Sequence, residues 1–286
     1  MSTPLPLRLL GLYPKKLGSS LVGLGANATI PPTLRRKLIG GFAARFGADV
    51  SEAEKPIEEY RSILDFFTRR LKPGLRPQAA PAPGALNSPV DGALLTCGVA
   101  DSGTLLQVKG LPYRIDELLP GEPLLPAFAS ASWATLYLAP RDYHRIHVPL
   151  PGRAVAVARI EGELWPVNDM STRHTPRLYV RNRRAYWIAE GTGPCEGLTV
   201  AVVMVAATHV GGVVVDPRWL EAGPALRGRE RRALGGLPCA PGDDLGTFEL
   251  GSTVVVVVGG ARAAEWRCTR EPGPIRLGER LGGFGL

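Results

Sequence analysis

The sequence predicts an α+β protein in which N-terminal amphipathic helices precede a mostly β core, built as packed sheets or a barrel-sandwich. Apolar residues recur at helical spacing before residue 72, and short β-branched or alternating runs recur after residue 85. Four prolines fall within residues 72–83 and interrupt regular structure between these two parts. We therefore expect a helical region at residues 1–72 and a β-rich domain at residues 73–286.

Composition places the chain among folded globular proteins. Of its 286 residues, 45% are hydrophobic and 21% charged, which excludes a disordered chain. The formal net charge of +8 suits nucleic acid, anionic lipid or an acidic substrate. Residues 1–48 contain no acidic residue, and they carry seven cations: Arg8, Lys15, Lys16, Arg35, Arg36, Lys37 and Arg45.

The first predicted helix is basic and amphipathic. Apolar side chains recur every four residues at Leu34, Leu38, Phe42 and Phe46, with the cations of residues 35–45 between them. This pattern is typical of a helix that lies in a membrane interface, and several cations near an anionic leaflet would strengthen the binding. The alternative is a helix that packs on the protein's own core and exposes its basic face to water.

A second helix is predicted at residues 52–71. Ser51 and Glu54 have the spacing of a capping box. An apolar stripe follows at Ile57, Tyr60, Ile63, Leu64, Phe67 and Leu71.

The β-rich part is predicted from eight apolar runs. They lie at residues 93–96, 105–108, 133–138, 154–160, 185–188, 198–206, 213–215 and 253–258. Residues 115–119 predict one helical turn, and the charge cluster at residues 227–232 predicts a solvated loop.

Two uncharged stretches, at residues 17–34 and 198–215, are long enough to be tested as membrane spans. The first contains Pro31 and Pro32, and the second is rich in valine with Gly211 and Gly212 near its middle. We expect neither to span a membrane, and we interpret the second as two buried strands. The N-terminal residues lack the apolar region of a signal peptide, so none is expected.

The cysteines predict no metal centre. Cys97, Cys195, Cys239 and Cys268 are far apart and form no CxxC spacing, which favours reduced structural thiols in a cytoplasmic protein. A zinc site built on His144 and His147 would need further ligands from His174 and His209, and no HExxH pattern is present.

Three short segments carry reactive groups. They are SPVDG at residues 88–92, YHRIH at 143–147, and LGST at 250–253 followed by five valines. Taken singly, Asp91 is a turn residue, the histidines lie on an irregular strand or loop, and Ser252 starts a buried strand. Together they supply an acid, a base and a nucleophile, because Asp91 can orient His147 and His147 can take the proton of Ser252.

The setting of Ser252 differs from that of a hydrolase. No GxSxG elbow is present, and strand formers follow the serine. Gly251 leaves room for the Ser252 hydroxyl to attack the carbonyl carbon of the preceding peptide bond. The resulting ester, after β-elimination, would release a chain that ends at Gly251, and the remaining dehydroalanine would hydrolyse to a pyruvoyl group with loss of ammonia.

The three motifs, in this order, resemble those of bacterial, pyruvoyl-dependent, membrane-associated phosphatidylserine decarboxylases. The resemblance also covers the basic N-terminus, the VND segment at residues 167–169 and the short C-terminal piece. It implies self-cleavage between Gly251 and Ser252 by a triad of Asp91, His147 and Ser252. His209, in the segment THVG, is a departure that we interpret as a local structural feature rather than an extra polar group of the site.

The resemblance also implies an activity. A pyruvoyl cofactor derived from Ser252 would form a Schiff base with phosphatidylserine and yield phosphatidylethanolamine and carbon dioxide, with His144 serving in decarboxylation and His147 as its competitor for that role. The large chain, 1–251, and the small chain, 252–286, would stay together as a heterodimer. We expect a peripheral enzyme on the cytoplasmic face of the cell membrane with no nucleic-acid partner; a higher oligomer stays open.

Two other interpretations remain at this point. One is a serine hydrolase, such as a lipase, that uses Asp91, His147 and Ser252 in acyl transfer. The other is a non-catalytic β-rich module that binds lipid or nucleic acid.

Overall fold

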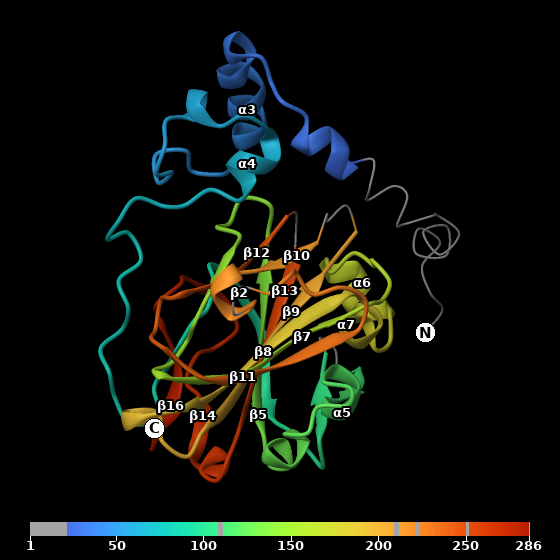
Figure 1. Cartoon of the computed structure of the whole chain (residues 1–286), viewed down its shortest axis with the longest axis vertical. Coiled ribbons are helices and arrows are strands. Elements are labelled where there is room, and N and C mark those ends of the chain that lie inside the picture. Colours follow the sequence, from blue (N-terminus) through green and yellow to red (C-terminus); the bar gives the residue numbers. More distant parts are fainter. Residues whose placement is uncertain (1–21, 108–110, 209–211, 221–222, 250–251, 286) are drawn as a thin grey trace.

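Figure 1 shows the computed structural model of the chain, with the N-terminal helices at one end and the strands, with short later helices beside them, forming the rest. The structure describes residues 22–107, 111–208, 212–220, 223–249 and 252–285. The N-terminal cations before residue 22, Gly251 and His209 therefore lie outside the described residues. The predicted α+β class, with N-terminal helices before a β-rich core, is confirmed.

The elements follow one another as a few short helices among many strands. Residues 22–27 are helical, and the α-helices that follow are α3 (Pro32–Phe46), α4 (Ile63–Phe67), α5 (Ile115–Leu118), α6 (Asp169–His174) and α7 (Leu178–Arg181). Single 3-10 turns lie at Ile57–Glu59, Leu125–Phe128, Gly193–Cys195, Pro217–Leu220 and Ala263–Glu265. The first eight strands are β1 (Leu86–Asn87), β2 (Gly92–Val99), β3 (Thr104–Leu106), β4 (Pro112–Arg114), β5 (Ser132–Leu138), β6 (Arg145–His147), β7 (Gly152–Ile160) and β8 (Arg184–Gly191). The others are β9 (Thr199–Ala206), β10 (Val213–Val215), β11 (Glu230–Cys239), β12 (Asp244–Phe248), β13 (Ser252–Gly259), β14 (Trp266–Cys268), β15 (Gly273–Ile275) and β16 (Arg280–Phe284).

An antiparallel sheet of eight strands forms the centre of the molecule, in the order β11-β7-β8-β9-β13-β5-β2-β15. Every residue of β13 is buried, so this strand is covered on both faces. Val254, Val256 and Val258 pack into one apolar cluster, and Val255 and Val257 pack into the cluster on the other face. A continuous apolar run suits a strand that contacts protein on both sides.

Three smaller sheets complete the core. Their orders are β1-β16-β14, β10-β12-β6 and β3-β4. The second of them places His147 on β6 opposite Asp244 on β12.

The N-terminal helices pack around their own small cluster. In α3, Ile39 and Ala43 are buried, and Phe42 meets the ring of Phe66 at a centroid distance of 6.5 Å. Leu34 and Leu38 stay 45% and 47% exposed. The predicted apolar stripe therefore divides, with Phe42 facing inward and the two leucines facing out.

The predicted helix at 52–71 is wrong. A 3-10 turn at Ile57–Glu59 and the short helix α4 replace it. Pro56 explains the interruption, because proline has no N–H and disfavours helical backbone in the residue before it. The helix cap is Ser62, whose hydroxyl accepts from the N–H of Asp65 at 3.0 Å, and not Ser51.

The solvated loop predicted at 227–232 is also partly wrong, because β11 begins at Glu230 and pairs with β7. Each of the eight predicted apolar runs overlaps a strand, although of the run at 105–108 only residues 105 and 106 lie on β3 and residue 108 lies outside the described residues; the turn at Ile115–Leu118 is confirmed. Beyond α4, the chain crosses the side of the core as an extended coil before β1 (Figure 1). In the described part of the chain, no helix has the length and apolar character needed to cross a membrane.

We expect the two faces of β13 to contribute equally to stability. Val254→Ala and Val255→Ala should each lower the free energy of unfolding by about 1–3 kcal/mol, because each removes buried methyl groups from a closed core. Val214→Ala, at a side chain that is 49% exposed on β10, is the control and should change it by less than about 0.5 kcal/mol. Urea denaturation followed by tryptophan fluorescence measures all three, and equal effects at Val214 and Val254 would contradict the two-faced core.

Candidate active site

The three motifs meet at the C-terminal end of β5. Ala93 of β2 pairs with Tyr137 on one side of β5, and Ser252 of β13 pairs with Leu138 on the other. The backbone N–H of His147 donates to the carbonyl of Pro89 at 2.9 Å, which joins the second motif to the first. The N–H of Phe248, shortly before the third motif, donates to the carbonyl of His144 at 3.0 Å.

Gly92 is required by this close packing. A Cβ at this position would lie 2.2 Å from the carbonyl oxygen of Tyr137, well inside contact distance. Only glycine lets β2 start so close to β5, immediately after Asp91. The Asp-Gly pair is therefore more than a turn signal.

Ser252 is fully buried as the first residue of β13. Among the described residues its Oγ has no hydrogen-bond partner. An unsatisfied buried hydroxyl costs about 1–3 kcal/mol, so such an atom in a native protein calls for an explanation, and a catalytic role is one such explanation.

His144 is buried and holds one ring nitrogen ready to accept a proton. Its ring packs against Phe67 at a centroid distance of 3.9 Å, and Nδ1 lies 2.8 Å from the carbonyl oxygen of Asp142. Since a carbonyl only accepts, Nδ1 carries the proton, and Nε2 is left without a partner in the described structure. Burial lowers the pKa of His144 to about 3, so the ring is neutral at neutral pH.

His147 has the same tautomer with different neighbours. Its Nδ1 donates to the carbonyl of Gly242 at 2.8 Å, and its Nε2 lies 3.2 Å from the hydroxyl of Tyr143. Asp244 Oδ1 is 3.6 Å from Nδ1. Burial lowers the pKa of His147 despite this carboxylate, so both histidines present a neutral Nε2.

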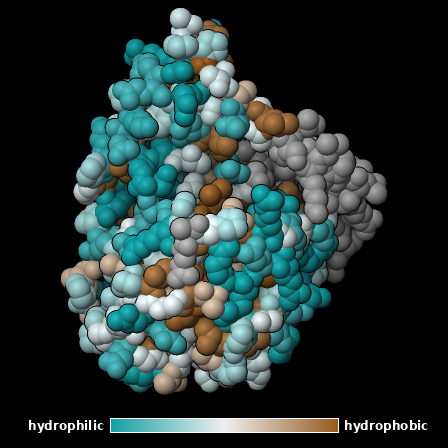
Figure 2. All heavy atoms as spheres, in the orientation of Figure 1, coloured by the Kyte–Doolittle hydropathy of each residue, from teal (hydrophilic) through white to brown (hydrophobic). Residues whose placement is uncertain are grey.

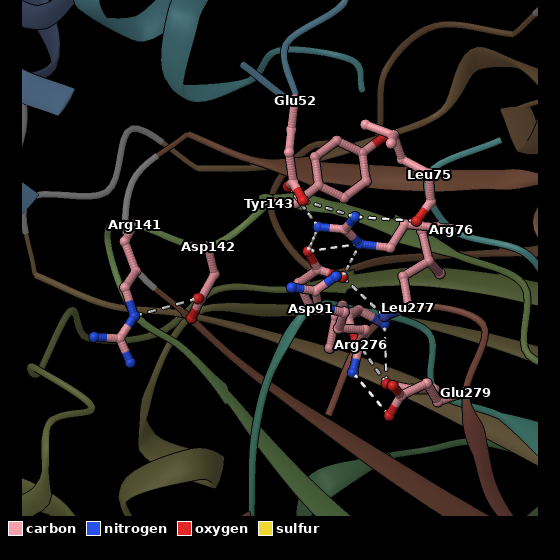
Figure 3. Close-up of polar contacts among 12 residues, drawn as sticks. Glu52, Leu75, Arg76, Asp91, Arg141, Asp142, Tyr143, Arg276, Leu277 and Glu279 are labelled. Carbon is pink, nitrogen blue, oxygen red and sulfur yellow. Dashed lines mark hydrogen bonds and ion pairs between the residues drawn. The ribbon is translucent and has the colours of Figure 1, made fainter. Parts of the chain in front are cut away.

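Asp91 is paired with an arginine and not with His147. Arg76 donates to Asp91 Oδ2 at 2.6 Å and to Glu52 at 2.7 Å, and the N–H of Leu277 donates to Asp91 Oδ1 at 2.8 Å (Figure 3). In the described structure the side chains of Asp91 and His147 make no hydrogen bond to each other. The structure thus brings the predicted segments together but gives Asp91 and His147 hydrogen-bond partners outside the predicted triad.

Sequence reasoning missed Arg76, Tyr143 and Asp244. Tyr143 could have been predicted from the sequence, because it lies within the YHRIH motif four residues before His147, the residue that its hydroxyl contacts. Arg76 stands in the proline-rich coil, and Asp244 is remote in sequence, so no local pattern marks either residue.

No group of three or more His, Cys, Asp or Glu side chains in the described residues is arranged to hold a metal ion. The four cysteines form no disulfide. A cavity of about 370 Å³ opens beside the site, and its wall includes Asp91, Gly92, Asp142 and Tyr143.

Comparison of the sequence with those of known proteins shows similarity to one family. The family model described as phosphatidylserine decarboxylase matches residues 63–283. A phosphatidylserine decarboxylase proenzyme of Myxococcus xanthus is 36% identical over 277 residues, covering 96% of this chain and 97% of the relative. Proteins of the same description from Anaeromyxobacter sp. (strain K) and Variovorax paradoxus are 39% and 40% identical, over 98% and 85% of this chain and 94% and 85% of their own lengths.

We expect the buried neutral histidines to make the protein acid-sensitive. An unfolded histidine takes up a proton near pH 6.5, but folded His144 does so only near pH 3, so stability is complete above pH 6.5 and is lost as the pH falls through this window. Each such histidine lowers the free energy of unfolding by up to about 1.4 kcal/mol per pH unit. Urea denaturation at pH 7, 6 and 5 should show a smaller decline for His144→Gln than for the wild type. Parallel declines for the two proteins would contradict a neutral buried His144.

Proposed function

This chain belongs to the phosphatidylserine decarboxylase family, and from this premise we propose that it cuts its own peptide bond between Gly251 and Ser252 and converts Ser252 into a pyruvoyl group. Family membership makes the protein a carboxy-lyase, so the hydrolase and the non-catalytic module are set aside. The observation that carries the proposal is the Ser252 hydroxyl, buried without a partner where the three motifs meet.

The proposed cut begins with attack of Ser252 Oγ on the carbonyl carbon of Gly251. The peptide bond becomes an ester, and loss of the Ser252 α-proton eliminates the carboxylate of the large chain. Hydrolysis of the remaining dehydroalanine releases ammonia. The pyruvoyl ketone then supplies an electron sink for the bond that breaks when carbon dioxide leaves. The fit for this group rests on the position of Ser252, whose backbone is fixed by strands on both sides.

We assign the proton of Ser252 to His147, with Asp91 behind the imidazole. The neutral ring and the lone pair on Nε2 support His147 as a base. Two contacts must exchange for this relay to form. The Tyr143 hydroxyl must leave Nε2, and Asp91 must turn from Arg76.

We assign His144 to the decarboxylation. After carbon dioxide leaves, the α-carbon of the product needs a proton, and a histidine is suited to give it. Burial is the main cause of the low pKa of His144, and the positive charge of Arg69 lowers this pKa further. The anionic groups of a bound substrate would raise this pKa and favour the protonated ring.

The two products of the cut would remain one molecule. The small chain begins with β13, which pairs with β9 and β5 of the large chain along its length. This arrangement supports a heterodimer of chains 1–251 and 252–286. Pyruvate as the covalent cofactor is what membership of the family implies.

We further propose that the N-terminal helices bind the membrane on its cytoplasmic face. Six large apolar side chains of this region are exposed: Val22, Leu24, Leu34, Leu38, Phe46 and Val50. Figure 2 shows hydrophobic residues among hydrophilic ones on this face of the helical end. Apolar side chains beside cations are the combination that holds a peripheral protein on anionic lipid.

Self-processing can be tested by mass. The wild type should give two fragments under denaturing conditions, and the smaller should begin with a ketone in place of an amine. Ser252→Ala and His147→Ala should remain a single chain because each removes a group needed for the first attack. A Ser252→Ala protein that is still cut at residue 251 would refute the assignment.

Fragment masses, together with an assay of carbon dioxide release from phosphatidylserine, separate the roles of the two histidines. His144→Ala should be processed but should decarboxylate phosphatidylserine about 10²-fold or more slowly, as is typical when a general acid is lost. Full turnover by processed His144→Ala would remove this residue from the chemistry.

Membrane binding can be tested by vesicle sedimentation. Leu34→Asp with Leu38→Asp should weaken binding to phosphatidylserine vesicles, because the change places charge on the exposed face of α3. Val99→Asp, at a residue 58% exposed on the β core, is the control and should leave binding unchanged. Equal binding of all three proteins would dismiss α3 as the membrane face.

A further inference from the structure

The cavity beside the active site lies between the helical region and the β core and is rich in charge. Its wall includes four arginines, Arg69, Arg76, Arg141 and Arg276, together with the carboxylates Asp49, Glu52, Asp91, Asp142 and Glu279. Its volume of about 370 Å³ is at the lower end of the range for small-molecule pockets.

Most of these charges already have partners. Arg76 is held between Asp91 and Glu52 (Figure 3). Glu279 pairs with Arg270 at 2.8 Å, and Asp142 lies 3.7 Å from Arg141. Asp49 accepts the N–H of Ser51. Within the described residues, Arg69 and Arg276 are the cavity's cations with no carboxylate oxygen within 4.0 Å.

Arg69 is the more unusual of the two because it is only 4% exposed. Its guanidinium donates to the carbonyls of Phe66 and Arg141 through long bonds of 3.4 and 3.3 Å, and its buried Nε has no partner among the described residues. Burial lowers the pKa of Arg69, and the attraction of Tyr60, Glu52 and Asp91 offsets this only in part because no carboxylate oxygen lies in contact with the guanidinium.

Arg184 shows how this chain satisfies a buried arginine for structure alone. It is 3% exposed, and it donates to the carbonyls of Leu118, Val180, Asn182 and Glu117 at 2.7–3.0 Å. Its Nε is used, unlike that of Arg69. Compared with Arg184, Arg69 therefore has fewer and longer hydrogen bonds, and its Nε has none in the described structure.

The position of Arg69 connects the cavity to the chemistry. Phe67, two residues earlier, packs on the ring of His144, and the cavity wall continues through Asp142 and Tyr143 of the histidine segment. An anion that completed the hydrogen bonds of Arg69 would lie beside the groups assigned to catalysis.

We propose that Arg69, assisted by Arg276, binds an anionic oxygen group of the phosphoserine headgroup, its phosphate or its carboxylate. An arginine fork matches both groups, and an anion there would supply the counterion that Arg69 lacks. Because Arg69 belongs to the large chain and Arg276 to the small one, both chains build this subsite. The identity of the ligand as substrate rests on the proposed function.

Binding can be measured apart from catalysis in the Ser252→Ala chain, which cannot form the ketone. Calorimetric titration with glycerophosphoserine should show binding at millimolar concentration or below. Arg69→Gln should weaken it roughly tenfold or more, as expected for lost hydrogen bonds between charged groups. Arg69→Lys should fall between, and Arg276→Gln should also weaken binding. Arg61→Gln, at an exposed arginine outside the cavity, is the matched control and should bind as the parent does.

Shorter probes identify the group that is held. If Arg69 holds the phosphate, its substitution should also weaken the binding of glycerophosphoethanolamine, which lacks the carboxylate. If it holds the carboxylate, the effect should be confined to glycerophosphoserine. Unchanged glycerophosphoserine affinity in Arg69→Gln, or no detectable binding by the parent, would overturn the proposal. If Arg69→Gln does not fold, unchanged affinity in Arg276→Gln would overturn it in the same way.

The processed enzyme separates this proposal from the proposed function. Arg69→Gln made with Ser252 intact should still cut itself, and its KM for phosphatidylserine should rise by a similar factor. A lower melting temperature with unchanged KM would assign Arg69 a structural role only. Failure of the wild type to cut itself would count against the proposed function and leave the binding result standing.

Discussion

The pairing of β13 on both edges is the constraint on which the rest of the site depends. β9 and β5 hydrogen-bond to it from Ser252 onward, and apolar clusters cover both of its faces. The first residue of this strand therefore has a fixed backbone position deep in the core. β5 then carries the chain directly toward the histidine segment, and the close approach of Gly92 to Tyr137 brings Asp91 to the same end. One strand thus sets the place where three remote segments meet.

Charge is arranged around this point so that the buried groups are mostly neutral or paired. His144 and His147 are held neutral by burial, and Asp91 is neutralised by Arg76. Arg76 also binds Glu52, so the same arginine ties the helical region to the core. Rearrangement of this ion pair would therefore change the contacts of Asp91 at the site and those of Glu52 in the N-terminal region. Asp91 and His147 are thus engaged with other groups, whereas the Ser252 hydroxyl and Nε2 of His144 have no partner in the described structure.

Much of the fold follows from local sequence, because periodicity and turn residues act over short distances. The valine run at β13 and the two consecutive runs at β9 and β10 are recognisable without knowing their neighbours. The failed prediction is equally local, since Pro56 outweighs the apolar stripe that favoured a long helix. β11 was missed because its first three residues, 230–232, are charged. Pairing with β7 nevertheless holds this strand in the sheet.

The site was predictable as a set of segments but not as a set of contacts. The residue types in SPVDG, YHRIH and LGST indicate their chemistry, whereas side-chain partners depend on chain segments that are distant in sequence. Arg76 and Asp244 reach Asp91 and His147 through such tertiary contacts. Arg69 belongs to the same class, since its burial and the missing partner of its Nε depend on tertiary packing that no local sequence pattern marks.

The C-terminal strands are distributed over two sheets. β13 and β15 belong to the eight-stranded sheet, while β14 and β16 join β1 in another. β13 and β15 are separated in the large sheet by β5 and β2, so the residues after 251 are interleaved with those before it. A molecule nicked at this bond therefore cannot trade its short piece with a neighbour unless both sheets open. Each molecule should therefore keep the two chains that come from its own precursor. If either chain is chemically damaged, the whole molecule is affected, because an intact chain cannot replace the damaged one.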